Sequence, residues 1–230
     1  MICEKISFRE KNHWIKVIEN EEELIKAYRL RHSVFCETLK WVPVNQLGME
    51  IDRYDAEAVH IGVFSEGGEL VGLARVLFSN QPYMLETEFS TLVGSSYVLR
   101  KDPETVEISR LTITSSVSQQ GLSSEYICFL LKGIYQWCFV NQVRYVYLVI
   151  EKKFWRVLTY LGFSCVPIGQ ETALPPGQVK AMAVIVDLEL FRNQTQKKKK
   201  EFVHWMSIAQ STPAPMQEQL HARELKLQVL

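Results

Sequence analysis

The chain has 230 residues, 47% of them hydrophobic, and its 26 basic residues balance 26 acidic ones. This length and composition predict one main domain with a buried core, and the neutral balance excludes a global field that would attract nucleic acid. The N-terminus is charged throughout and no apolar run approaches the roughly 20 residues of a membrane span, so we expect a cytoplasmic protein that needs no membrane.

The first predicted element is a helix over residues 21–40. Asn20 followed by Glu23 resembles a capping box, and apolar residues then recur at helical spacing. Residues 41–58 follow neither a helical nor a strand period and contain a proline and a glycine. Long irregular stretches inside compact domains are often functional, so this stretch is predicted to be a functional loop.

Strands and helices follow this loop. Apolar runs at residues 60–66 and 69–78 flank a Gly-Gly pair, which favours a tight hairpin turn. Residues 106–114 are predicted to be a third strand. The apolar segment 122–142 is predicted to be a largely buried helix.

The next segments complete an alternating pattern. Residues 143–151 are rich in β-branched and aromatic side chains, which predicts a strand. A short helix over 152–161 should end at Gly162, a natural C-terminal cap, and residues 180–190 should form a last strand. Strands interleaved with helices predict an α/β fold, in which a mixed central sheet is flanked by helices in three α/β/α layers.

The last residues differ from the rest of the chain. We expect residues 1–192 to form the domain and residues 193–230 to form a polar C-terminal tail, partly helical or flexible. This tail opens with the lysine run Lys197–Lys200 and contains two prolines. The lysine run is interpreted as a flexible exposed segment rather than as a nucleic-acid site.

The cysteines and histidines indicate no metal or redox centre. Five cysteines are scattered without a C-x-x-C pair, so we expect reduced packing residues. Cys36 as a catalytic nucleophile is a weaker alternative, because the sequence marks no base for it. The acidic loop lacks the calcium-binding pattern and the five histidines are scattered, so no metal is expected.

Arg31 lies in the apolar stripe of the first predicted helix rather than on its solvated face. Burying an unpaired charge costs several kcal/mol, so a buried guanidinium needs carboxylate partners. The following loop offers Glu50, Asp52 and Asp55. The alternative is an arginine at the edge of the stripe whose charged head reaches water.

Two predicted core strands also contain charges. Arg75 lies within the run 69–78, and Glu107 and Arg110 lie within 106–114, where a plain core strand would have none. On a regular strand Glu107 and Arg110 face opposite sides, so one shared pocket requires a β-bulge between them or a pocket around the strand end. A catalytic site and an ion-pair network that only specifies the fold explain these charges equally well.

Five segments of the sequence resemble a known family. They are RLRHSVFCETLKW, MEIDRYD, the arginine of VGLARVL, QPYMLETEF and EISRL. In order and spacing, over about residues 24–190, they are similar to the acyl-homoserine-lactone synthases, which make bacterial quorum-sensing autoinducers. The resemblance implies a fold similar to the N-acetyltransferases. It also implies an acyltransferase that joins an acyl group from a thioester to the amine of S-adenosylmethionine, which then cyclises and releases methylthioadenosine.

The resemblance also implies roles for individual residues. S-adenosylmethionine is a substrate in this reaction, so no cofactor is expected, and its pocket is implied at Arg31, Phe35, Trp41, Asp52, Asp55 and Arg75. The catalytic set is implied at Arg31, Arg110 and Glu107, with Glu107 as the candidate base. An acyl pocket is implied at Met84, Leu111 and Tyr147. Leu111 replaces a phenylalanine common in the family, and the strand around Tyr147 lacks the threonine found in many makers of 3-oxo-acyl signals, so a 3-oxo preference is not expected.

The acyl donor is predicted from other residues. Ordinary acetyltransferases bind pyrophosphate at a Q/R-x-x-G-x-G/A turn, and residues 118–123 match that pattern poorly. Cations that suit an acidic acyl carrier protein lie at Lys152, Lys153, Arg156 and Lys180. Acyl carrier protein is therefore the expected partner and acyl-coenzyme A the alternative. A plain solvated face is the other interpretation of these cations.

Two other functions stay open at this point. An N-acyl amino acid synthase, or another amine N-acyltransferase of the same fold, would share much of the charged set, although Trp41 and the QPYML segment favour a lactone synthase. An inactive module that binds acyl carrier protein belongs to a different class. The intact charged set argues against such a module.

Overall fold

The computed structural model describes residues 3–175 and 179–209. These residues form two compact units. The first unit contains residues 3–75, 110–141 and 201–209, and the second contains residues 76–109, 142–175 and 179–200. Two strands, β4 (Leu70–Phe78) and β5 (Thr105–Ile113), begin in one unit and end in the other.

The first unit contains strands in the order β1-β2-β3-β4-β5. Besides β4 and the end of β5, its elements are β1 (Ser7–Glu10), β2 (His13–Val17), α1 (Glu21–Arg31), the π-helix η1 (His32–Thr38), the 3-10 turn η2 (Asp55–Glu57), β3 (Val59–Phe64), α2 (Ser115–Gln119), α3 (Ser123–Val140) and α6 (Lys200–Ser207). β2 runs antiparallel to both β1 and β3. A turn with Gly68 at φ +79° joins β3 to β4, which confirms the predicted hairpin.

The second unit contains strands in the order β5-β6-β9-β7, with β8 pairing with β9. Its elements are the 3-10 turns η3 (Met84–Glu86) and η4 (Ser90–Leu92), β6 (Tyr145–Glu151), α4 (Lys152–Leu161), β7 (Cys165–Pro167), β8 (Thr172–Leu174), β9 (Val179–Asp187) and α5 (Leu188–Thr195). β5 runs parallel to β6, whereas β9 runs antiparallel to its neighbours, so the predicted mixed sheet is confirmed.

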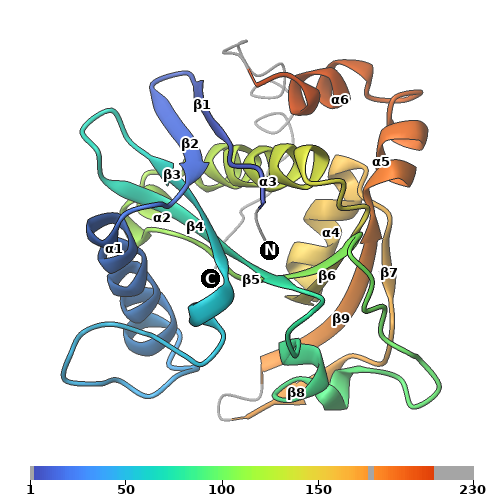
Figure 1. Cartoon of the computed structure of the whole chain (residues 1–230), viewed down its shortest axis with the longest axis horizontal. Helices are drawn as coiled ribbons and strands as arrows, with labels where there is room; N and C mark the ends of the chain where they lie inside the picture. The colour runs from blue at the N-terminus through green and yellow to red at the C-terminus, as the bar shows by residue number, and fades with distance from the viewer. Residues whose placement is uncertain (1–2, 176–178, 210–230) are drawn as a thin grey trace. The chain divides into compact units, whose positions relative to one another are not determined.

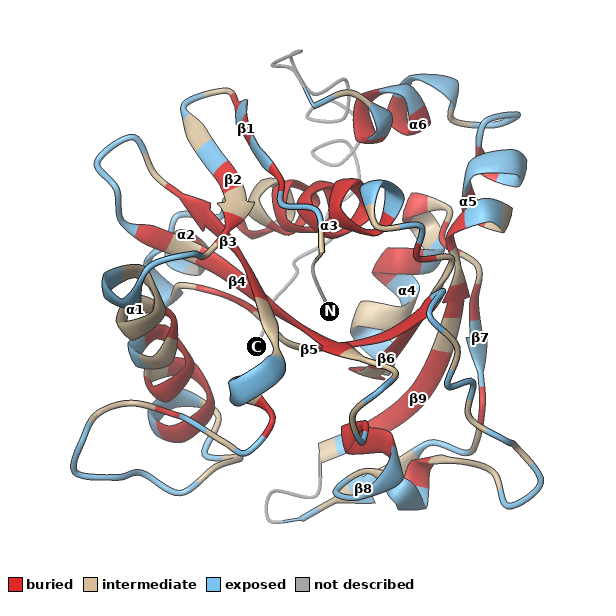
Figure 2. Ribbon diagram, in the orientation of Figure 1, coloured by how far each residue is buried: buried red, intermediate tan, exposed pale blue. Residues whose placement is uncertain are grey.

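Helices cover both faces of the strands in the first unit (Figure 1). Side chains alternate along β3, so Ile61 and Phe64 point to opposite faces. Phe64 packs in a cluster with Leu30 of α1, whereas Ile61 meets α3 at Gly133, where a Cβ would lie 3.1 Å from the Ile61 side chain. Figure 2 shows α3 buried along most of its length. No helix among the described residues is nevertheless long and apolar enough to cross a membrane.

The first predicted helix starts as expected but changes its form before its end. Asn20 Oδ1 accepts a hydrogen bond from Glu23 N at 2.8 Å, which confirms the cap. The predicted extent of about 21–40 is confirmed to within two residues, but only α1 is α-helical, and the π-helix η1 continues it to Thr38. In this wider turn Leu39 N donates to a carbonyl five residues back, at 2.8 Å. The hydrophobic pattern of the sequence does not distinguish this π-helix from an α-helix.

The last predicted strand is too long by three residues. β9 ends at Asp187 because Asp187 Oδ1 accepts hydrogen bonds from Glu189 N and Leu190 N, both at 3.0 Å, and so caps α5. The expected domain boundary after residue 192 falls inside α5. The preceding helix α4 ends at Gly162, which has φ +102° and caps it as predicted.

The segment expected to be a polar tail contains a buried helix. Four side chains of α6 are buried, at Phe202, Val203, Trp205 and Met206. Lys132 Nζ of α3 lies 4.6 Å from the centroid of the Trp205 ring and 2.5 Å from Glu10 Oε2 of β1. The apolar face of α6 therefore packs in the core of the first unit. Residues 210–230 lie outside the described residues.

Candidate active site

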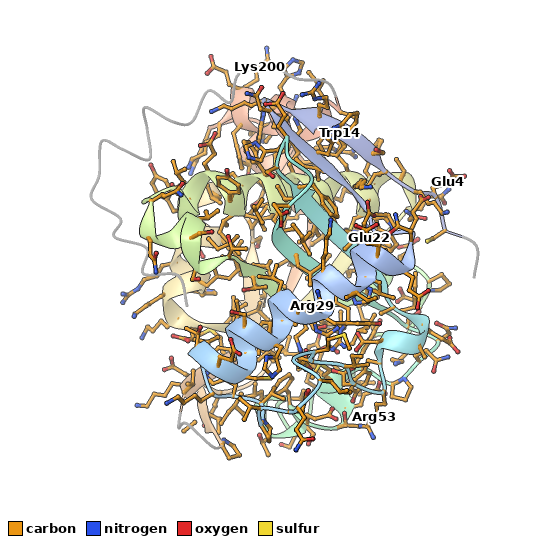
Figure 3. All side chains as sticks on the ribbon, turned by 90° about the vertical axis from the view of Figure 1, so that its left-hand side faces the viewer. Glu4, Trp14, Glu22, Arg29, Arg53 and Lys200 are labelled. Carbon is orange, nitrogen blue, oxygen red and sulfur yellow. The ribbon has the colours of Figure 1, made fainter. Side chains whose placement is uncertain are left out.

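Arg31 is the centre of a buried cluster of charges in the first unit. Its side chain is wholly buried, whereas Glu22 and Arg29, labelled in Figure 3, are exposed on the same helix. Arg31 Nε donates to Glu50 Oε2, and Nη1 donates to Asp55 Oδ1 at 2.6 Å. The predicted pairing with loop carboxylates is confirmed. The alternative in which Arg31 reaches water is wrong.

Glu50 connects Arg31 to Arg110. Arg110 Nε and Nη2 donate to the two oxygens of Glu50 at 2.9 and 2.8 Å, and Nη2 also donates to Asp52 Oδ2 at 3.0 Å. Burial alone would raise the pKa of Glu50, but the hydrogen bonds from Arg110 and Arg31 outweigh it and lower the pKa to about 2. Glu50 is therefore an anion held between two guanidinium groups.

Arg75 completes the cluster from β4. Its Nη1 donates to Asp52 Oδ1 at 2.6 Å and to Asp55 Oδ1 at 2.9 Å. Asp55 Oδ2 accepts from Asp52 N at 2.8 Å, so the two aspartates also fix the backbone between them. Burial alone would raise the pKa of Asp55, but the contacts from His60 and Arg31 hold it well below its ordinary value. Three arginines thus face three carboxylates in one cluster.

His60, near the start of β3, belongs to the cluster although the sequence analysis did not select it. It is buried, its Nε2 lies 3.3 Å from Asp55 Oδ1, and its ring meets that of Tyr28 edge to face. Burial lowers the pKa of His60 more than Asp55 raises it, which favours the neutral ring. A histidine directly after an acidic loop was the available signal in the sequence.

Phe35 and Trp41 provide aromatic walls beside Arg110. The guanidinium carbon of Arg110 lies 5.4 Å from the centroid of the Phe35 ring, and the Phe35 and Trp41 rings are 6.1 Å apart. Trp41 N donates to Phe35 O at 2.9 Å, which ties the start of the loop to η1. The first unit thus brings together all the residues predicted for the substrate pocket. Burial raises the pKa of the Cys36 thiol, which argues against its alternative role as a nucleophile.

The strand β5 is irregular where its charged residues lie. Arg110 has φ +53°, a left-handed conformation that residues other than glycine rarely adopt. A left-handed residue interrupts the regular strand conformation at this position, whereas the bulge that a pocket shared by Glu107 and Arg110 would require stays a prediction. Arg110 belongs to the first unit and Glu107 to the second.

Glu107 is buried in the second unit, and its Oε2 accepts a hydrogen bond from Leu85 N at 3.3 Å. The neighbouring Tyr83 is also buried, and its hydroxyl donates to Thr105 O at 2.9 Å. Burial raises the pKa of Tyr83, so this hydroxyl stays protonated. A buried carboxylate oriented by a backbone N–H can accept a proton from a bound substrate.

Two of the three residues predicted for the acyl pocket lie in the second unit. Tyr147 is the β6 residue opposite Glu107 in the parallel pairing, and its buried hydroxyl lies 3.1 Å from the hydroxyl oxygen of Tyr97. Met84 is buried in η3. Leu111 belongs to the first unit and is half-buried, so the three predicted residues do not share one unit.

The predicted docking cations are all exposed in the second unit, at Lys152, Lys153, Arg156 and Lys180. The antiparallel register pairs Glu151 with Ala181, which brings Lys180 beside the start of α4. The first turn of α4 contains no acidic residue. Cations at a helix N-terminus oppose the helix dipole, so this basic surface is not explained by the stability of the helix.

The family assignment rests on a match over most of the chain. The family model described as autoinducer synthase matches residues 16–196. The chain belongs to the autoinducer synthase family. This synthase is therefore an acyltransferase, as its sequence predicted. Its elements β1 and α6 lie outside the range that the family model matches.

Individual relatives agree with this assignment. The synthase is 26% identical over 170 residues to an acyl-homoserine-lactone synthase of Vibrio anguillarum, a match that covers 73% of this chain and 88% of the relative. An acyl-homoserine-lactone synthase of Aeromonas salmonicida is 26% identical over 192 residues, which cover 82% of this chain and 88% of the relative. A similar fold is found in the structure of BjaI, a CoA-dependent acyl-homoserine lactone synthase, with MTA. The TM-score is 0.69 at 23% identity, and the match covers 86% of this chain and 92% of that chain. This likeness supports the α/β fold.

Proposed function

We propose that this autoinducer synthase makes an N-acyl-homoserine lactone from S-adenosylmethionine and an acyl thioester. The observation that supports this most directly is the buried cluster of Arg31, Arg75 and Arg110 with Glu50, Asp52 and Asp55. An ion-pair cluster of this size is weak evidence for stability, because buried ion pairs seldom stabilise more than apolar packing would. The cluster is better explained as a rigid frame for a charged substrate.

The first unit would bind S-adenosylmethionine. Arg31, Asp52 and Arg75 tie the loop of residues 41–58 to α1 and β4, so the loop would hold the substrate in a fixed position. Phe35 and Trp41 offer aromatic surfaces, which attract a sulfonium cation as well as an adenine ring.

Glu107 would act as the base of the acylation step. It takes a proton from the substrate ammonium, directly or through water, and the neutral nitrogen then attacks the thioester carbonyl. The new N–C bond forms as the C–S bond breaks, and the carrier leaves as a thiol after taking a proton. Backbone N–H groups are the proposed donors to the developing oxyanion.

Lactone closure would follow without a further catalytic group. The homoserine carboxylate forms a bond to its own γ-carbon while the bond from that carbon to sulfur breaks. The electron pair goes to the positively charged sulfur, so methylthioadenosine leaves as a neutral molecule. Holding nucleophile and electrophile together provides a large effective molarity, so positioning suffices for this step.

Acyl carrier protein is the proposed acyl donor. Its acidic surface is complementary to the basic surface of Lys152, Lys153, Arg156 and Lys180, and such complementarity increases the association rate. BjaI is described as CoA-dependent, which makes acyl-coenzyme A the alternative donor.

Incubation of the purified protein with S-adenosylmethionine and acyl thioesters tests the reaction. Mass spectrometry should detect an acyl-homoserine lactone together with methylthioadenosine in equal amounts. An N-acyl amino acid synthase would give acylated amino acid without methylthioadenosine. A protein that binds acyl carrier protein and turns nothing over would reject the enzymatic function.

The identity of the acyl donor is tested by comparing the same acyl chain attached to acyl carrier protein and to coenzyme A. Charge reversal in Lys152→Glu/Arg156→Glu should lower kcat/KM for the carrier-protein substrate, and raised salt should lower it in the native protein. The matched control is Lys197→Glu/Lys198→Glu, the same charge change at exposed residues of the same unit. Equal use of acyl-coenzyme A, with no selective loss in the Lys152/Arg156 variant, would reject the docking surface. Acyl-coenzyme A would then be the favoured donor.

A further inference from the structure

Lys101 makes three contacts with one short segment of the second unit, residues 81–86. Its Nζ donates to Gln81 O and to Glu86 Oε2, each at 2.6 Å, and lies 3.8 Å from the centroid of the Tyr83 ring. One ammonium group therefore reaches both ends of the segment and the ring between them. Lys101 itself lies outside the five segments that carry the family resemblance.

The same segment is attached to β5 at two points. The Tyr83 hydroxyl donates to Thr105 O at 2.9 Å, and Leu85 N donates to Glu107 Oε2 at 3.3 Å. Within the segment, Glu86 Oε2 also accepts from Tyr83 N at 2.6 Å. Residues 81–86 therefore connect Lys101 to the carboxylate that we propose as the base.

The contacts of Lys101 are better explained by positioning than by overall stability. The side chains of Lys101 and Glu86 are 31% and 36% exposed, and ion pairs with that much solvent contribute little to the free energy of unfolding. The regular secondary structure within the segment is limited to the short 3-10 turn η3, so side-chain contacts contribute much of what fixes its position. The hydrogen bond from Leu85 N is already long, so a small displacement of the segment would break it.

We propose that Lys101 is a positioning residue, which holds residues 81–86 so that Leu85 N orients the carboxylate of Glu107. The consequence for catalysis rests on the proposed role of Glu107 as the base. A displaced carboxylate would meet the substrate nitrogen in the wrong geometry, so the chemical step would slow while substrate binding in the first unit would not change.

Hydrogen exchange and steady-state kinetics on Lys101→Met and Lys101→Arg test this proposal. Lys101→Met keeps the aliphatic stem and removes the ammonium, and it should raise amide exchange at Leu85 and its neighbours. It should lower kcat roughly tenfold with KM for S-adenosylmethionine unchanged, since a tenfold change needs only about 1.4 kcal/mol in the transition state. Lys101→Arg can still donate to both oxygens, so it should restore most of the protection and most of kcat.

Lys198→Met is the matched control, because it removes an exposed lysine of the same unit and should change neither measurement. Unchanged exchange at Leu85 in Lys101→Met would overturn the proposal, and so would raised exchange with unchanged kcat. If Lys101→Met does not fold, Lys101→Gln removes the positive charge and shortens the side chain, so it should also raise exchange at Leu85 and lower kcat. Hydrogen exchange does not require turnover. A wild-type protein that makes no lactone would therefore refute the proposed function, whereas the effect of Lys101 on exchange at Leu85 would still be measured.

Discussion

Glu50→Gln should destabilise the protein strongly, because it removes one negative charge from between two buried arginines. The pKa of Glu50 is lowered from its ordinary 4.5 to about 2, because the hydrogen bonds from Arg110 and Arg31 outweigh the cost of burial. At about 1.4 kcal/mol for each pH unit, this corresponds to about 3 kcal/mol of stability at neutral pH. Breaking a buried ion pair costs a similar 3–5 kcal/mol by general experience. The midpoint of thermal unfolding should therefore fall by roughly 6–12 °C.

The pH dependence separates this effect from a loss of packing. The folded-state pKa of Glu50 lies below the unfolded one, so its stabilisation is complete above pH 4.5 and disappears as the pH falls toward 2. The difference between wild type and Glu50→Gln, measured by urea unfolding, should be about 3 kcal/mol at pH 7 and less than half of that at pH 3. A difference that does not change with pH would assign the loss to packing.

Glu22→Gln is the matched control for this experiment. Glu22 forms an ion pair with Lys26 on the surface of α1, where its side chain is 83% exposed. Such pairs contribute roughly 0.3–0.5 kcal/mol, so this variant should unfold almost as the wild type does. Equal unfolding of Glu22→Gln and Glu50→Gln at pH 7 would refute the reasoning about the buried cluster.

Two further substitutions test the proposed roles in the reaction. Glu107→Gln keeps an oxygen for the hydrogen bond from Leu85 N and removes basicity, so kcat for acylation should fall by roughly 10²- to 10⁴-fold with the fold retained; near-normal turnover would exclude Glu107 as the base. Arg31→Lys keeps the charge but cannot donate to Glu50 and Asp55 in one plane, so the affinity for S-adenosylmethionine should fall, as measured by calorimetry. Unchanged affinity and stability in that variant would contradict the positioning role of Arg31.

The hydrophobic pattern predicted the larger elements because each has a long apolar period. The third strand, the buried helix and the helix before Gly162 all lie close to their predicted limits. The strands β1 and β2 were not predicted, because Ser7–Glu10 and His13–Val17 are short and charged or polar residues interrupt their apolar pattern. It also missed β7 and β8, which have three residues each.

The charged site was predicted more completely than its local geometry. A charge inside an apolar stripe requires partners, and on this ground Arg31 and its acidic loop could be predicted from the sequence. It did not show that Glu50 would be shared between two arginines, because sharing depends on how β5 lies beside that loop. The left-handed conformation of Arg110 and the π-helix before the loop are also results of tertiary packing, which local propensities do not encode.

The balance of charge explains why the cluster must be complete. Three guanidinium groups face three carboxylates, so the removal of any one leaves a buried charge without its counterion and costs more than the contact that is lost. A neutral His60 preserves this balance, since protonation would add a fourth positive charge beside Asp55. The cluster joins α1, the loop of residues 41–58, β4 and β5. The loop therefore keeps its conformation only while all four segments supply their members, and any substrate that binds to this loop depends on the whole set.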